Sequence, residues 1–242
     1  MNPLKNTIAI NKVYRGFRKY LKNVPAIRAA QSRGDHAEAQ RIIRKGEDYF
    51  CDHTGASLGI KVDVINPENI PNKGPYLVVA NHQSYADIYA LIDAFRSTQI
   101  GFIASETKKL KPLADVIRGT ESVFIDRGNP RAAIQTLKET TELFKNGYTL
   151  AIFPEGTRSH SNDMGYFKPG SFKFAQKAKV PIVPVSIIDS YKIFEEHNTF
   201  NAGTIKVVIH PTVHFEAMSR EEQNAAHEQI EDLIRTGIAK YR

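Results

Sequence analysis

The sequence predicts an α/β protein, with a three-layer α/β/α domain on a largely parallel sheet that follows an N-terminal basic helical hairpin. Two patterns predict this class. From Leu58 onward, short apolar stretches alternate with stretches of helical periodicity. Before that point, apolar residues recur at helical spacing among lysines and arginines. The chain of 242 residues, 41% of them hydrophobic, is long enough for one sizeable α/β domain and a small appendage.

The N-terminal segment has the pattern of two helices, the first of them basic and amphipathic. In the first, the apolar residues at helical spacing are Val13, Phe17, Tyr20, Leu21 and Val24. Pro25 is expected to end this helix, and Asp35 is expected to cap a second helix that runs to Phe50. We therefore predict a helical hairpin over residues 1–55 and an α/β domain over residues 56–242.

The α/β domain is expected to alternate strands with helices. The expected strands are residues 58–65, 76–80, 100–104, 122–125, 148–153, 182–188 and 205–209. The expected helices are residues 87–95, 109–118, 130–145 and 171–178, with a last one that begins near Ser219. Ligands of such sheets bind beyond the carboxyl ends of the strands, and polar clusters follow three of these strands, at 81–87, 126–129 and 154–159.

Positive charge is concentrated near the N-terminus. Residues 1–50 carry 11 lysines and arginines against 4 aspartates and glutamates, whereas the rest of the chain carries 22 of each sign. A basic segment on a neutral body predicts attraction to a polyanion, either an anionic membrane surface or a nucleic acid. Nucleic-acid binding calls for basic and aromatic groups across the folded body, so we expect the membrane surface and no nucleic acid. A solvated hairpin packed on the domain is the alternative.

Membrane contact is expected to be peripheral. The N-terminus has no apolar run of signal-peptide length, and nowhere do the roughly 20 apolar residues of a transmembrane helix occur together. The single cysteine, Cys51, cannot form an intrachain disulfide and lacks the further ligands of a zinc site. We expect a packed thiol, no metal, and a protein on the cytoplasmic face of a membrane.

The first polar cluster, residues 81–87 (NHQSYAD), contains a possible base. A carboxylate at Asp87 can orient His82 through one ring nitrogen while the other ring nitrogen accepts a proton from an alcohol. Taken alone, these two residues are more often a loop histidine and a helix cap. The cluster at 153–159 (FPEGTRS) has the parts of an anion site, with a flexible Gly156 and an arginine, Arg158, that can grip a phosphate through two hydrogen bonds.

Four blocks together resemble the glycerolipid acyltransferase family, of which bacterial 1-acyl-glycerol-3-phosphate acyltransferases are typical. They are NHQSYAD at 81–87, VFIDR at 123–127, FPEGTRS at 153–159 and VPIVPV at 180–185. Their order and spacing are far more specific than any one block. The resemblance implies transfer of a fatty acyl group from acyl-CoA or acyl-carrier protein to the free hydroxyl of 1-acyl-glycerol-3-phosphate, which gives phosphatidic acid in phospholipid biosynthesis.

The resemblance also implies the roles of individual residues. His82 acts as general base without a covalent intermediate and Asp87 orients it, while the acceptor is bound by Arg127, Glu155, Gly156, Thr157 and Arg158. No cofactor is implied, because the thioester supplies the driving force. The alternatives are another lysophospholipid or glycerol 3-phosphate as acceptor, a thioester hydrolase that activates water, and a non-enzymatic polyanion-binding protein.

Overall fold

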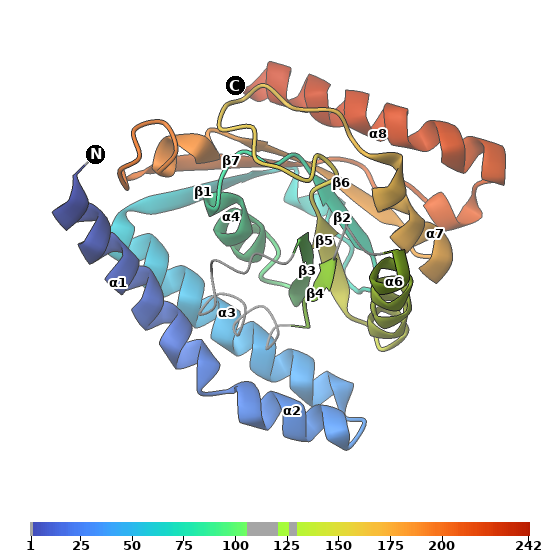
Figure 1. Cartoon of the computed structure of the whole chain (residues 1–242), viewed down its shortest axis with the longest axis horizontal. Helices are drawn as coiled ribbons and strands as arrows, with labels where there is room; N and C mark the ends of the chain where they lie inside the picture. The colour runs from blue at the N-terminus through green and yellow to red at the C-terminus, as the bar shows by residue number, and fades with distance from the viewer. Residues whose placement is uncertain (1, 106–120, 126–129) are drawn as a thin grey trace.

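A computed structural model describes residues 2–105, 121–125 and 130–242 (Figure 1). Its centre is a seven-stranded sheet in the order β1-β7-β6-β2-β5-β3-β4, with helices on both faces. All neighbouring strands run parallel except β6 and β7, which are antiparallel. The predicted fold class, α/β on a largely parallel sheet, is confirmed.

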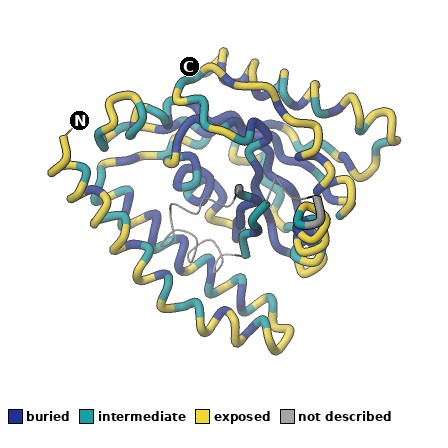
Figure 2. The backbone as a smooth tube through the Cα atoms, in the orientation of Figure 1, coloured by how far each residue is buried: buried dark blue, intermediate teal, exposed yellow. Residues whose placement is uncertain are grey.

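The seven expected strands are all present. They are β1 (Ile60–Ile65), β2 (Leu77–Ala80), β3 (Ile100–Ser105), β4 (Val123–Ile125), β5 (Thr149–Ile152), β6 (Ile182–Ile188) and β7 (Gly203–Ile209). Strands β2, β5 and β6 are buried along their whole length, which explains why their sequences are continuous apolar runs (Figure 2).

The helices form two layers around the sheet. On one face, α3 (His36–Leu58) and α4 (Ala86–Ala94) pack against Val78 and Ala80 of β2. On the other face, α6 (Pro130–Lys145), α7 (Lys173–Ala178) and α8 (Arg220–Tyr241) pack against Leu77 and Val79 of the same strand. Alternate residues of the central strand thus belong to opposite cores, as a three-layer domain requires.

The N-terminal segment contains three helices rather than the two expected. Helix α1 (Pro3–Leu21) begins ten residues before Val13, the first apolar residue of the expected helix, and α2 (Val24–Ser32) contains Pro25 in its first turn. Proline fits there because the N–H groups in the first turn of a helix have no carbonyl partner within the helix. The missing N–H of proline therefore costs no hydrogen bond. Asp35 caps α3 as expected, and α3 ends at Gly59, whose φ is +69°. The boundary between residues 55 and 56 stays a prediction.

Two further expectations bear on the membrane and on Cys51. None of the helices in the described ranges is both long enough and apolar enough to cross a bilayer. The expected helix at 109–118 lies outside the described residues. Cys51 is a free, buried thiol, and burial raises its pKa far above the usual range, so it is a poor nucleophile.

Candidate active site

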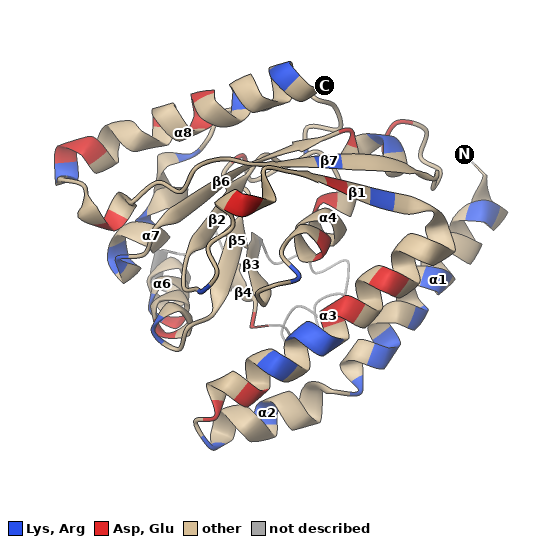
Figure 3. Cartoon of the chain, turned by 180° about the vertical axis from the view of Figure 1, so that it is seen from behind, with Lys and Arg blue, Asp and Glu red and all other residues tan. Residues whose placement is uncertain are grey.

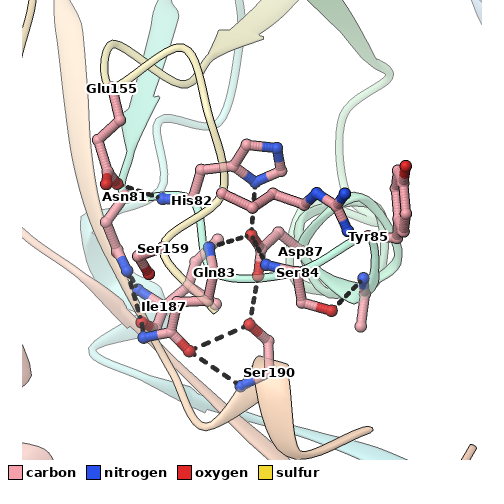
Figure 4. A network of polar contacts seen from close by, with 12 residues as sticks. Asn81, His82, Gln83, Ser84, Tyr85, Asp87, Glu155, Ser159, Ile187 and Ser190 are labelled. Carbon is pink, nitrogen blue, oxygen red and sulfur yellow. Dashed lines mark hydrogen bonds and ion pairs between the residues drawn. The ribbon is translucent and has the colours of Figure 1, made fainter. Parts of the chain in front are cut away.

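Three loops meet at one edge of the sheet. Strand β2 lies between β5 and β6 and runs parallel to both, so the segments that follow these strands leave the sheet on the same side. Residues 81–85 follow β2, residues 153–159 follow β5, and residues 189–195 follow β6. Figure 4 shows side chains from these three loops converging around Asp87. Two of the polar clusters expected at strand ends are therefore brought together.

The loop after β2 is held in place by its first residue. Asn81 is buried, and its side chain donates to the Ile187 carbonyl at 2.9 Å and accepts from the Ile187 N–H at 2.7 Å. These two hydrogen bonds tie the end of β2 to β6. The next residue, His82, therefore leaves the sheet in a fixed direction.

His82 and Asp87 form a closely paired dyad. His82 Nδ1 lies 2.7 Å from Asp87 Oδ2, and the imidazole stacks on the Phe153 ring with 4.1 Å between the ring centroids. The Asp87 side chain is fully buried in the first turn of α4, whereas the His82 side chain keeps 17% of its surface exposed. A substrate can therefore reach the imidazole but not the carboxylate.

The neighbours of Asp87 fix the tautomer of His82. Oδ2 also accepts the backbone N–H groups of Gln83 at 2.7 Å and Ser84 at 2.9 Å. An oxygen that accepts two backbone N–H groups carries no hydrogen of its own, so His82 Nδ1 donates to it. The other ring nitrogen, Nε2, points away from Asp87 (Figure 4), and because Nδ1 carries the hydrogen, Nε2 carries a lone pair. This arrangement can take a proton from a hydroxyl group.

Glu155 joins the β5 loop to the β2 loop. Its Oε1 accepts the His82 N–H at 2.6 Å, and its Oε2 accepts the Gly165 N–H at 2.8 Å. Burial raises the pKa of this carboxyl, while the two N–H donors oppose the rise. The Ser159 N–H also donates to the His82 carbonyl at 2.8 Å. Both oxygens of Glu155 thus have backbone partners within the protein.

The turn after Glu155 carries the remaining residues of the motif. Gly156 has a φ of +72°, a left-handed conformation that residues with a side chain rarely adopt. Thr157 lies exposed at the tip of the turn. The guanidinium of Arg158 lies over the Tyr85 ring, 3.6 Å from its centroid, and its Nη1 donates to Glu195 at 2.8 Å. Arg127, the other arginine predicted to bind the acceptor, lies outside the described residues.

Comparison with known proteins places this site in a family. A family model described as Acyltransferase matches residues 61–188, a range that includes the dyad and the turn at 153–159. The chain belongs to the acyltransferase family. Its predicted family membership is therefore confirmed, and relatives named 1-acyl-sn-glycerol-3-phosphate acyltransferases confirm its class as an O-acyltransferase.

The acyltransferase is similar to proteins whose names state an acyltransferase activity. It is 37% identical over 188 residues to a probable 1-acyl-sn-glycerol-3-phosphate acyltransferase of Mycoplasma genitalium, covering 73% of this chain and 70% of the relative. A protein of the same description from Mycoplasma pneumoniae is 42% identical, covering 54% of this chain and 51% of the relative, so the chain spans about half of that protein. The crystal structure of the 1-acyl-sn-glycerophosphate acyltransferase PlsC of Thermotoga maritima matches with a TM-score of 0.76 and 27% identity, covering 100% and 99% of the two chains.

Sequence reasoning missed two residues of the acyltransferase site, Glu195 and Ser190, whose side chains are buried. Glu195 accepts from the Ser84 hydroxyl at 2.6 Å and from the Tyr85 N–H at 3.1 Å, besides pairing with Arg158. Ser190, two residues after the end of β6, donates its hydroxyl to Asp87. Ser190 could have been predicted from the sequence. Asp189 and Ser190 follow an apolar strand in the same way as the polar clusters that were recognised.

Proposed function

We propose that this acyltransferase moves a fatty acyl group from acyl-CoA or acyl-carrier protein to the free hydroxyl of 1-acyl-glycerol-3-phosphate. The product is phosphatidic acid, which serves phospholipid biosynthesis. The observation that carries the proposal is the fixed His82–Asp87 dyad, whose accessible ring nitrogen is free to accept a proton. The names of the relatives point to the same acceptor.

In the proposed reaction, His82 Nε2 removes the proton of the acceptor hydroxyl as its oxygen attacks the thioester carbon. The carbon–sulfur bond then breaks, and the thiolate takes the proton back from the imidazolium. Asp87 stabilises the imidazolium and keeps Nδ1 protonated. Because His82 acts as a base and not as a nucleophile, no acyl-enzyme forms. The residues of this chain complete the cycle without a cofactor.

Binding of the acceptor phosphate is assigned to Arg158 and Arg127, with Gly156 and Thr157 at the mouth of the site. Nη1 of Arg158 donates to Glu195. A guanidinium has five N–H donors, so other donors of Arg158 can bind a phosphate. Stacking on Tyr85 holds the guanidinium flat beside the dyad. Glu155 acts on the backbone of His82 and shapes the loop that carries the base.

The test compares the full acceptor with one that lacks the acyl chain and one that lacks the phosphate. With a fixed acyl-CoA donor, thiol release is measured with 1-acyl-glycerol-3-phosphate, with glycerol 3-phosphate and with 1-acyl-glycerol. We expect kcat/KM for 1-acyl-glycerol-3-phosphate to exceed that for 1-acyl-glycerol at least about a hundredfold, because charge-assisted hydrogen bonds to phosphate are lost with the neutral lipid. Equal use of both lipids would overturn the assignment of a phosphate site.

We further propose that α1 rests on an anionic membrane surface. Its outer face is apolar near the N-terminus, where Leu4, Ile8, Ile10 and Tyr14 are 71%, 49%, 57% and 46% exposed. Farther along, the outer face is basic, and Figure 3 shows lysines and arginines along this helix. Apolar contact with basic flanks is the pattern of an interfacial helix.

The position of α1 brings the site close to that surface. The Asn6 side chain donates to the Asn198 carbonyl at 2.8 Å and accepts the Phe200 N–H at 3.0 Å. These residues follow Glu195, which contacts Ser84 and Arg158. A lipid acceptor bound at the membrane therefore has a short path to the dyad.

Replacing Arg15 and Arg18 with glutamine is expected to weaken binding to vesicles that contain anionic lipid by roughly 30-fold at low salt, because each basic group near such a surface contributes about 1 kcal/mol. Sedimentation with vesicles measures the binding. Point variants are preferred to deletion because Phe17 of α1 stacks on Phe50 of α3. The matched control replaces Lys173 and Lys177 of α7. An equal loss of vesicle binding in the control would contradict a role for α1.

A further inference from the structure

A buried serine lies behind the dyad, on the side away from His82. Strand β6 ends at Ile188, and Asp189 then adopts a left-handed conformation with φ of +67°. Ser190 follows as the first residue of a short 3-10 helix, and it is 0% exposed. This turn sends the serine side chain toward α4, where Asp87 lies (Figure 4).

The hydroxyl of Ser190 has one hydrogen and two nearby acceptors, Gln83 Oε1 at 3.2 Å and Asp87 Oδ1. Gln83 Oε1 already accepts the Ser190 N–H at 3.1 Å. The contact with Asp87 Oδ1 is the shorter of the two, and a carboxylate is a stronger acceptor than an amide oxygen, so the hydroxyl donates to Asp87.

The orientation of the Gln83 amide agrees with this assignment. Its Nε2 donates to the Ile187 carbonyl and to Asn162 Oδ1, each at 2.8 Å, and neither of these oxygens carries a hydrogen to give. The oxygen of the amide must therefore face Ser190. Asn162 Oδ1 in turn accepts the Asp189 N–H at 3.0 Å. The serine hydroxyl is thus held by a network in which each partner has a defined role.

We propose that Ser190 is a positioning residue of the acyl-transfer reaction that acts on His82 through Asp87. Oδ2 of Asp87 faces His82 and two backbone N–H groups, while Oδ1 is held by the serine hydroxyl. The hydroxyl stops rotation of the carboxylate and withdraws part of its negative charge from the imidazole. The proposal rests on the function proposed above.

The effect on the pH profile has a definite sign. Without the hydroxyl, Asp87 keeps its backbone donors and stays beside His82, but its charge is less dispersed. The protonated imidazole is then more stable, and the acid limb of kcat/KM moves to higher pH. The charged groups of the described chain around the dyad and Ser190, which the substitution leaves unchanged, are Glu155, Arg158, Asp189, Lys192 and Glu195.

The test uses Ser190→Ala in the purified full chain with acyl-CoA and 1-acyl-glycerol-3-phosphate. We expect the midpoint of the acid limb to rise by about 0.5 pH unit and kcat to fall about fivefold, with the KM values for both substrates unchanged. Ser190→Cys fills the same space with a weaker donor, and its profile is expected to lie between those of Ser190→Ala and the parent protein.

The matched control is Ser186→Ala. Ser186 is a fully buried serine of β6, and its hydroxyl donates to the Ile234 carbonyl at 2.8 Å and lies 2.7 Å from His210 Nε2, away from the dyad. This variant is expected to lose stability without a shift in the pH profile. The proposal is overturned if both Ser190 variants keep the parent profile, or if Ser186→Ala shifts it equally.

His82→Ala in the same assay separates this proposal from the proposed function. If His82→Ala is inactive while the Ser190 variants behave as the parent protein, only the positioning role of Ser190 fails. If His82→Ala remains active, the general-base role of His82 fails, and the positioning role of Ser190 fails with it.

Discussion

Replacement of His82 with alanine is expected to lower kcat for acyl transfer at least about a thousandfold, because the acceptor hydroxyl then has no base to take its proton. The fold is expected to survive. Asp87 keeps the Gln83 and Ser84 N–H groups and the Ser190 hydroxyl as donors, so no buried charge loses all its partners. Thiol release measures activity, and circular dichroism measures folding.

The control for this variant is His160→Ala. His160 is an exposed histidine of the adjacent loop, and its backbone N–H donates to the Gln83 carbonyl at 3.2 Å. Because that contact uses the backbone, loss of the side chain leaves it intact, and we expect near-normal activity. A folded His82→Ala variant that keeps more than about a tenth of the parent activity would remove the general base from the mechanism.

The second large effect is expected for Asp87→Asn, with kcat/KM about a hundredfold lower. The amide oxygen can take the place of Oδ2 and accept from His82, Gln83 and Ser84, and the amide nitrogen can donate to Ser190. The substitution therefore removes the negative charge and keeps the geometry. Loss of a hydrogen bond between charged groups contributes about 1.5–3 kcal/mol, which corresponds to roughly tenfold to 150-fold in rate.

The pH profile of Asp87→Asn tests whether the lower rate comes from loss of the negative charge. Loss of the charge makes the protonated imidazole less stable, so the acid limb of kcat/KM is expected to move to lower pH, opposite to the shift for Ser190→Ala. The control is Asp163→Asn, at a carboxylate whose side chain is 91% exposed. A change of less than about threefold for Asp87→Asn would contradict the orienting role of this carboxylate.

The strands were predictable because of where they lie in the sheet. A parallel strand that is buried on both faces is a continuous apolar run, and β6 begins and ends at the residues predicted. The start of α8 was predictable from Ser219, which forms a capping box with Glu222. Helix α1 was predicted too short because Leu4, Ile8 and Ile10 point outward, so the periodicity of its first turns does not mark a buried face.

The site was predictable where residues of one motif act together, and not where distant residues complete it. His82 and Asp87 are five positions apart, and their pairing could be expected from the motif. Ser190 and Glu195 reach the same loop from more than 100 residues away, and only the pairing of β6 with β2 brings them there. The sequence contained no sign that Glu195 would neutralise Arg158.

The most direct measurement of acyl transfer is thiol release from acyl-CoA with and without 1-acyl-glycerol-3-phosphate, followed together with formation of phosphatidic acid. If His82 activates the acceptor hydroxyl, each thiol released corresponds to one phosphatidic acid formed, and omission of the acceptor reduces release to the background rate. Equal thiol release without the acceptor, with free fatty acid as the product, would show that His82 activates water and that the protein is a thioester hydrolase.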